Sequence, residues 1–268
     1  SGRSLADRLD TFEIMTYRSL IGIIIVLTVA FYASTWQQIS TKRLGLHLIR
    51  NVFHFAGQNL WFFAVIYVPL SQLFVFEFST PLWVAIFAPL ILSEKLTLTR
   101  FSAAAIGFFG ILVLLLPITP ELNVWGAIFA LLGALFAALM FVYLRILGRS
   151  DSPVSTAIWY NSVGAVLAGI LTYIFDRTTP LINLPGFEVI YVFIALGVLA
   201  SFQQFFLAQS HMYAEASVLA PLHYLSIPFS VCVGILFFGE IITVKFLIGT
   251  SIIIASTYYI FLREQAHN

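Results

Sequence analysis

Charged residues are scarce in this chain. Lysine, arginine, aspartate and glutamate together make up 9% of its 268 residues, and the formal net charge is +1. A soluble domain usually carries about a quarter charged residues, so the scarcity excludes an ordinary soluble globular protein. No basic run is interleaved with aromatic residues, and the composition therefore gives no indication of nucleic-acid binding.

Cysteine is almost absent. The single one, Cys232, excludes an intrachain disulfide and any site that needs several thiolates. The five histidines include no pair at spacing i, i+4, and there is no Gly-rich phosphate loop, no HExxH and no Ser-His-Asp arrangement. We therefore expect no catalytic residues, no metal and no cofactor, and a protein that is not an enzyme.

Apolar residues are abundant. They make up 60% of the chain, the mean hydropathy is +0.99, and the apolar runs last about twenty residues, as a bilayer-crossing helix requires. Strands of an outer-membrane barrel would instead alternate apolar and polar residues over about ten positions. The expected fold class is therefore all-α, a polytopic membrane helix bundle. Its nine complete spans are predicted at Phe12–Ala33, Gly45–Tyr67, Val68–Leu92, Phe101–Leu116, Val124–Leu147, Val154–Phe175, Phe187–Ser210, Ser217–Phe238 and Val244–Leu262.

Residues 146 positions apart are related by an internal repeat. Glu77 falls on His223 and Thr80 on Ser226, so ionisable and hydroxyl groups recur at matching depths. Such repeats are typical of secondary transporters, whose substrate site lies at the interface of the repeats. We expect a first repeat at 1–117 and a second at 118–268. The identities at this offset are Gln58 with Gln204, Tyr67 with Tyr213, Ser71 with Ser217, Leu73 with Leu219, Leu90 with Leu236, Glu94 with Glu240, and Thr97 with Thr243.

Aligning the two copies leaves the first one helix short. The parent protein is therefore predicted to have ten helices, one of them before Ser1. Five spans per repeat is an odd number, so the copies must cross the membrane in opposite directions, which makes the repeat inverted. Basic residues in loops and at span ends are more frequent on one side, which predicts a cytoplasmic C-terminus.

Three short motifs accompany the repeat: FEIMTYRSLIG early in the first span, and the SEKLT and GEIIT closures before the last helix of each copy. With them the chain resembles the drug/metabolite transporter superfamily, and within it the EamA-like permeases with two five-helix repeats. The resemblance implies an inner-membrane carrier or exporter in which the third, fourth, eighth and ninth helices of the ten-helix parent line a central cavity. It also implies that Phe101–Leu116 and Val244–Leu262 lie at the periphery. Some members import S-adenosylmethionine, so import stays open.

Polar residues form a stripe on the second predicted span. His47, Asn51, His54, Gln58 and Trp61 follow at spacings of 4, 3, 4 and 3, which places them on one helix face. Lipid satisfies no hydrogen bonds, so this face must meet protein or water. For His54 and Gln58 we favour the lining of a cavity over hydrogen bonds between helices. For His47 and Asn51 we favour a wet interface or packing.

Glu77 is the most informative single residue, because a carboxylate inside a membrane span costs several kcal/mol, about 2.5–3.5 on insertion scales. It shares a helix face with Thr80, and Pro81 frees a backbone carbonyl nearby. Glu77 is therefore a candidate proton carrier or counter-charge for a cationic substrate. The alternative is a structural pair with Arg18 or His223.

Further candidates come from the second copy and from the first span. His223 suits gating or coupling, or it is a packed histidine, and Arg18 either reaches the outer surface or binds a substrate carboxylate. Glu94 and Glu240 are expected to be structural, as caps of the following helix. The candidate substrate-binding residues are His54, Gln58, Asn59, Trp61, Glu77, Thr80, Gln203, Gln204, His223, Tyr224, Ser226 and Arg18, with Glu77 and His223 also proposed for proton coupling.

Together these features favour a secondary carrier that works by alternating access in the bacterial inner membrane. The expected substrate is a small polar or amphipathic metabolite, an amino acid or a related compound, nucleoside-like ones such as S-adenosylmethionine included. Export is favoured over import. Partners are the lipid bilayer and the substrate, with protons as a candidate coupling ion, no nucleic acid, and a monomer or homodimer. The alternatives are a membrane-embedded lipid-handling enzyme or flippase-like protein, and an accessory membrane subunit.

Overall fold

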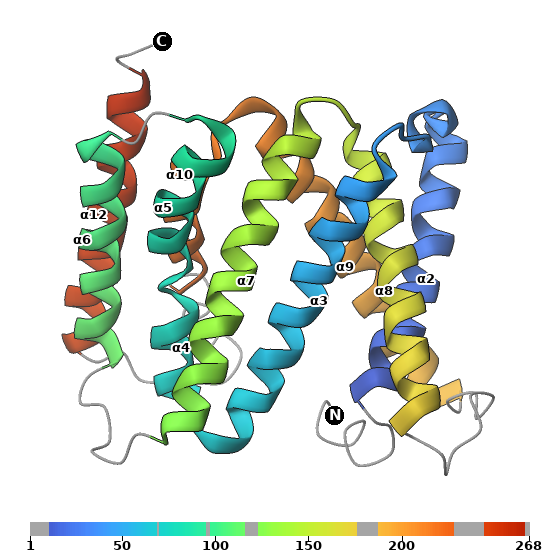
Figure 1. The fold of residues 1–268 in the computed structure, drawn as a ribbon, viewed down its shortest axis with the longest axis horizontal. Coiled ribbons are helices and arrows are strands. Elements are labelled where there is room, and N and C mark those ends of the chain that lie inside the picture. Colours follow the sequence, from blue (N-terminus) through green and yellow to red (C-terminus); the bar gives the residue numbers. More distant parts are fainter. Residues whose placement is uncertain are drawn as a thin grey trace. The chain divides into compact units, whose positions relative to one another are not determined.

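A computed structural model of the chain describes residues 11–68, 70–94, 97–115, 123–175, 187–227 and 244–265 (Figure 1). Helices dominate these segments, and none of them contains a β-strand. The predicted all-α membrane helix bundle is therefore confirmed. Residues 1–10 lie outside the described residues, as do 228–243, which include Cys232 and Glu240.

Five of the described helices are long and apolar enough to cross a membrane. These five candidate spans are Phe12–Tyr32, Leu73–Leu92, Val124–Gly148, Pro153–Ile174 and Phe193–Tyr213. Helix α3 (Leu44–Tyr67) has 24 residues, but it carries the polar stripe, which lowers its hydropathy. Shorter apolar helices cover Leu98–Val113, Ala216–Leu225 and Leu247–Tyr259.

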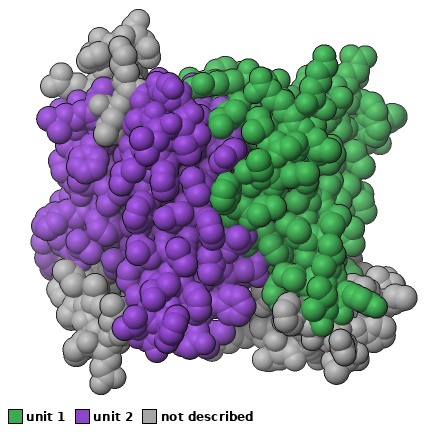
Figure 2. All heavy atoms as spheres, in the orientation of Figure 1, with its two compact units in different colours: residues 1–55, 146–213 green, residues 56–145, 214–268 purple. Residues whose placement is uncertain are grey.

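The chain divides into two compact units (Figure 2). Unit 1 contains residues 1–55 and 146–213, and unit 2 contains residues 56–145 and 214–268. The unit boundaries fall within α3 and within α7 (Val124–Gly148). Each unit takes segments from both predicted repeats, so the units do not follow the repeat boundary at residue 117.

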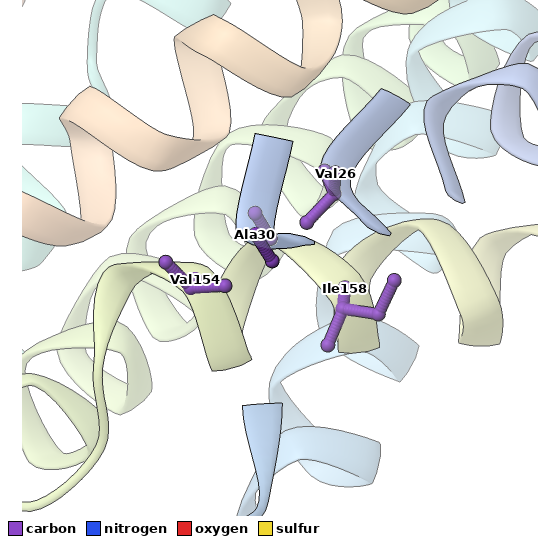
Figure 3. Close-up of a cluster of buried hydrophobic side chains, with 5 residues drawn as sticks. Val26, Ala30, Val154 and Ile158 are labelled. Atoms are coloured by element: carbon purple, nitrogen blue, oxygen red, sulfur yellow. The ribbon is translucent and has the colours of Figure 1, made fainter. Parts of the chain in front are cut away.

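Unit 1 is built on α2 (Thr11–Tyr32), α8 (Pro153–Phe175) and α9 (Phe187–Tyr213), with a short 3₁₀ helix, η1 (Trp36–Ile39). Helices α2 and α8, which fall at corresponding places in the two predicted repeats, pack on each other and run in opposite directions (Figure 1). Their contact is an apolar cluster in which small and β-branched side chains interdigitate (Figure 3). The buried members of that cluster are Val26, Ala30, Val154, Ala157 and Ile158.

Unit 2 contains α4 (Leu70–Glu77), α5 (Thr80–Leu92), α6 (Leu98–Leu115), α10 (Ala216–Leu219), the 3₁₀ helix η2 (Ala220–Leu225) and α12 (Val244–Gln265), besides most of α7 and the second half of α3. Helices α6 and α12, which fall at corresponding places in the predicted repeats, pack on each other and are antiparallel (Figure 1). Ile111 of α6, Ile253 of α12 and Tyr224 of η2 form the buried core between them.

The predicted span Val68–Leu92 is interrupted at Phe78 and Ser79, between α4 and α5. Pro81 has no N–H to donate to the carbonyl of Glu77, four residues earlier. The hydroxyl of Thr80 donates to that carbonyl instead, at 2.6 Å. The helix is thus interrupted with its freed backbone oxygen already in a hydrogen bond, a bond that the sequence does not predict.

The corresponding stretch of the second repeat is also irregular. Ala216–Leu219 is α-helical, Ala220–Leu225 continues as a 3₁₀ helix that contains Pro221, and residues 226 and 227 are again α-helical. The predicted eighth span, Ser217–Phe238, therefore begins with a change of helix type, and its remainder from residue 228 lies outside the described residues. Both stretches lie in unit 2, where α5 packs against α10 and η2.

Replacement of Gly107 by alanine is expected to destabilise unit 2. A Cβ at this position would overlap the ring of Tyr224, which is fully buried and donates its hydroxyl to the carbonyl of Ala104 at 3.0 Å. Overpacking of this kind costs about 1–3 kcal/mol, so the thermal midpoint of the detergent-solubilised protein should fall. Gly45→Ala is the control, because nothing lies within 4 Å of its added Cβ. Equal midpoints for the two variants would contradict the expected overlap.

Candidate functional site

Arg50 is the centre of a polar cluster in unit 1. Its side chain is fully buried. One guanidinium nitrogen, Nη1, donates to Oδ1 of Asn51 at 2.7 Å, and the other, Nη2, donates to Oε1 of Gln204 on α9 at 2.6 Å. The Nδ2 group of Asn51 in turn donates to the carbonyl oxygen of Trp159 at 3.3 Å. The cluster thus links α3, α8 and α9 through polar groups alone.

Tyr160 of α8 lies beside this arginine. The guanidinium carbon of Arg50 is 5.3 Å from the centre of the Tyr160 ring, a cation–π distance. From α2, Nη2 of Arg18 donates to the Tyr160 hydroxyl at 3.1 Å. The ring of His54 meets the same tyrosine edge-on, with 5.1 Å between ring centres. Two cationic side chains and one imidazole therefore surround a single buried phenol.

Three predicted site residues, Arg18, His54 and Gln204, meet in this cluster. The alternative that Arg18 extends to the outer surface is not what the structure shows, because its guanidinium is bonded to Tyr160 in the interior. Of the neighbouring glutamines on α9, Gln204 is buried and bound to Arg50, whereas Gln203 is exposed. Gln203 is thus not part of the cluster.

Sequence reasoning missed Arg50 as a site residue. It was counted only as a basic residue near the cytoplasmic end of a span, which is where such residues usually lie. The signal was present, because Arg50 directly precedes Asn51 and lies four residues before His54, on the edge of the polar stripe. Tyr160 is also absent from the predicted site residues, and the structure buries it.

His47 joins a separate contact at the loop between α7 and α8. Its Nε2 atom is 2.7 Å from Oδ2 of Asp151, which also accepts a hydrogen bond from Thr41. Burial alone would raise the pKa of Asp151, but hydrogen bonds from Thr41, His47 and Ser150 outweigh burial and hold this pKa below its ordinary value. The adjacent Ser152 accepts a hydrogen bond from the Ser155 amide at 3.0 Å at the start of α8. This contact fixes a loop, and the favoured packing role of His47 agrees with it.

Glu77 ends α4 in unit 2, directly before the break in the predicted third span. Its side chain is exposed, and its Oε2 atom accepts a hydrogen bond from the indole Nε1 of Trp61 at 2.8 Å. Trp61 lies at the end of the polar stripe, on the part of α3 that belongs to unit 2. Two residues predicted for one site are thus in direct contact.

His223 and its neighbours have different surroundings from Glu77. The ring of His223 is half-buried and lies 4.5 Å, centre to centre, from the ring of Phe141 on α7. Within the described part of unit 2, no hydrogen bond joins Glu77 to His223. Tyr224 is fully buried, bonded to the backbone of α6. Tyr224 is therefore a core residue, and its hydroxyl is already hydrogen-bonded to the protein.

The remaining predicted residues are divided between packing and exposure. Thr80 is buried, and its hydroxyl is bonded to the Glu77 carbonyl. Ser226 is exposed and donates to the carbonyl of His223 at 2.7 Å. Gln58 and Asn59 are half-buried on α3. Thr80 and Ser226, equivalent in the repeat, thus both bond to the carbonyl three residues earlier.

Glu94 is structural, as expected, but it does not cap the following helix. Its carboxylate accepts hydrogen bonds from the amides of Ala216 and Ser217, at 3.3 and 3.4 Å, and from the Ser217 hydroxyl at 3.1 Å. Nε of Arg145 lies 3.6 Å from the same carboxylate, and Arg100 pairs with Glu215. Glu94 therefore joins the end of α5 to the start of α10, 122 residues later in the sequence.

No group of three or more His, Cys, Asp or Glu side chains suited to a metal ion occurs among the residues that the structure describes. What the two sites offer instead is recognition by hydrogen bonds, by charge and by aromatic faces. The cluster in unit 1 presents donors and cations, and the pair in unit 2 presents one carboxylate. Such groups can hold a polar solute inside an apolar bundle.

Comparison with known proteins gives one family and several named relatives. The EamA-like transporter family matches residues 1–116 and 124–262. An S-adenosylmethionine uptake transporter from Rickettsia felis is 28% identical over 265 residues, 97% of this chain and 86% of that protein. A riboflavin transporter from Brucella anthropi is 25% identical over 229 residues, 85% and 80% of the two chains. A second riboflavin transporter, from Vibrio cholerae, is 28% identical over 241 residues, 90% and 79% of the two chains.

A solved crystal structure has the same fold. It superposes with a TM-score of 0.81 over 95% of this chain and 90% of its own length, at 16% sequence identity. At this level of identity the likeness concerns the fold alone.

Proposed function

Because this chain belongs to the EamA-like transporter family, we propose that it is a secondary carrier for a small polar or amphipathic metabolite. The observation that carries the proposal is the fully buried Arg50, held by Asn51 and Gln204 among apolar helices. Polar and ionisable groups inside membrane segments are costly and are typical of substrate pathways. Gln204 and Gln58 are equivalent positions of the repeat, a pattern typical of alternating-access carriers.

The named relatives support a substrate of nucleoside or flavin size. Proteins similar to this chain are described as transporters of S-adenosylmethionine and of riboflavin. Both compounds combine a flat heterocycle with a polar chain, so both are amphipathic. The sequence analysis favoured export. The word uptake in the names of the Rickettsia relatives favours import, and import is the direction we propose.

The remaining parts of the proposal concern the membrane, the topology of the chain in it, and the driving force of transport. The relatives are bacterial proteins, which supports a location in the bacterial inner membrane. The excess of basic residues on one side of the predicted spans supports a cytoplasmic C-terminus. The antiparallel packing of α2 with α8 and of α6 with α12 supports the inverted arrangement of the two predicted repeats (Figure 1). Proton coupling through Glu77 and His223 completes the proposed mechanism, in which no cofactor takes part and the carrier acts as a monomer or homodimer.

The test is an untargeted comparison of metabolite uptake. Cells that express the full chain and cells that carry an empty vector are supplied with a mixture of labelled metabolites that includes S-adenosylmethionine and riboflavin. Expression should raise the intracellular amount of one compound or of a closely related group. The purified protein in liposomes should then exchange that compound with an internal pool, while empty liposomes should not. Identical metabolite profiles in both cell lines would contradict the carrier function.

A further inference from the structure

The cluster around Tyr160 has more donors and positive charge than its described partners can satisfy. Arg50 is fully buried, yet both groups to which it donates, on Asn51 and Gln204, are neutral amides. Among the residues that the structure describes, no aspartate or glutamate is hydrogen-bonded or ion-paired to Arg50 or Arg18. An arginine keeps its charge under all ordinary conditions, so Arg50 is a buried cation without a counter-ion among the described residues of unit 1.

One buried donor of the cluster, Nε of Arg50, also lacks an acceptor among the residues that the structure describes. The indole Nε1 of Trp159, whose ring lies 6.0 Å from that of His47, lacks one as well. Buried polar atoms are nearly always hydrogen-bonded, and an exception in a native protein calls for an explanation. An uncompensated buried charge costs several kcal/mol. A ligand that brings negative charge and acceptor atoms would compensate the charge of Arg50 and accept a hydrogen bond from its Nε atom.

We propose that Arg50 and Arg18, on either side of Tyr160, bind a carboxylate of the transported metabolite. The planar guanidinium of Arg50 matches a carboxylate in two parallel hydrogen bonds, and the amide oxygens of Asn51 and Gln204 now occupy the donors that such a carboxylate would take. Arg18 approaches the same phenol from α2, and the Tyr160 ring offers a flat face beside the charge. The three side chains come from three different helices, so their positions depend on the fold of the whole unit.

This inference rests on the proposed carrier function and narrows its substrate class. S-adenosylmethionine has a carboxylate on its amino-acid end, whereas riboflavin is uncharged at neutral pH. The cluster therefore favours amino-acid-like metabolites over neutral flavins, although relatives of both kinds resemble this chain to a similar degree.

The experiment compares S-adenosylmethionine with its decarboxylated form, which differs only by the loss of the carboxylate. Uptake is measured in liposomes that contain the purified full chain, with riboflavin and the amino acids as further probes. Half-maximal uptake of the decarboxylated compound should require a concentration at least about 30-fold higher. This factor corresponds to about 2 kcal/mol, the loss expected when one partner of a charge pair is removed. Arg50→Gln should weaken S-adenosylmethionine binding by a similar factor and make the two forms nearly equal.

Controls separate binding from folding. Arg43→Gln removes an exposed arginine near the start of α3 and should leave the preference unchanged. Arg50→Gln keeps a polar side chain opposite Gln204 and removes a buried charge, so its thermal midpoint should not fall. If this variant does not fold, Arg18→Gln, half-buried on another helix, should show the same loss of preference for the carboxylate.

Four results would overturn the proposal. Equal uptake of both forms of S-adenosylmethionine, or uptake of riboflavin but of no carboxylate-bearing probe, overturns the carboxylate site and leaves the carrier function standing. An unchanged preference in a folded Arg50→Gln variant overturns the role of this arginine. No uptake of any probe above empty liposomes contradicts the proposed function and the carboxylate site together.

Discussion

Glu77→Gln is expected to abolish the response of transport to a pH gradient. A difference of one pH unit stores about 1.4 kcal/mol per proton, enough for up to about tenfold accumulation of a solute that moves with one proton. If the Glu77 carboxylate carries that proton, the glutamine variant should equilibrate its substrate without accumulating it. The measurement is the ratio of internal to external substrate in liposomes, with and without an imposed pH gradient.

The structure supplies a matched control for this experiment. Trp61→Phe keeps an aromatic ring beside Glu77 and removes the indole N–H that donates to the carboxylate at 2.8 Å. Because the carboxylate remains, the Phe variant should still accumulate substrate when a pH gradient is applied. An unchanged accumulation ratio in Glu77→Gln would end the proposal that Glu77 carries the proton, and the other proposed coupling residue, His223, would then be the next to replace.

Glu94→Ala should cause the largest loss of stability among these variants. The carboxylate is buried and serves two backbone amides, one hydroxyl and the nearby guanidinium of Arg145. Removing one partner of a buried charge pair costs about 3–5 kcal/mol, so the thermal midpoint of the solubilised protein should fall steeply. Glu94→Gln keeps an acceptor oxygen and should lie between the alanine variant and the natural protein.

The control for Glu94→Ala is the replacement of Glu77, a second carboxylate of unit 2. The side chain of Glu77 is exposed and its carboxylate accepts one hydrogen bond, from Trp61, so Glu77→Gln should change the free energy of unfolding by no more than about 0.5 kcal/mol. Equal thermal midpoints for Glu94→Ala and Glu77→Gln would show that the contact between Glu94 and α10 does not stabilise the unit.

The helices themselves could be predicted well from the sequence, because bilayer thickness sets the length of an apolar run. The predicted span Val124–Leu147 and the observed helix Val124–Gly148 differ by one residue. The break in the helix after Glu77 was harder to predict from the sequence. Pro81 indicated a freed carbonyl, but whether a helix bends, stops or continues at a proline depends on the hydroxyl groups and neighbours that take its place.

The candidate site was predicted in part. A polar stripe on one helix face does identify residues that avoid lipid, and it led to His54. The side-chain partners come from other helices and cannot be read from periodicity, so Arg50 was left among the basic residues of the membrane surface. Tyr224 was assigned to the site because it follows His223. In a 3₁₀ helix each residue turns the chain by about 120°, so adjacent side chains point to different surroundings.

The pairing of α2 with α8 and of α6 with α12 has a consequence for the origin of this chain. Each compact unit contains helices from both predicted repeats, so a polypeptide with one predicted repeat would leave the apolar faces of these helices without their partners. A chain of that length would be expected to associate with a second copy of itself. Joining the copies in one chain makes that association intramolecular and independent of protein concentration.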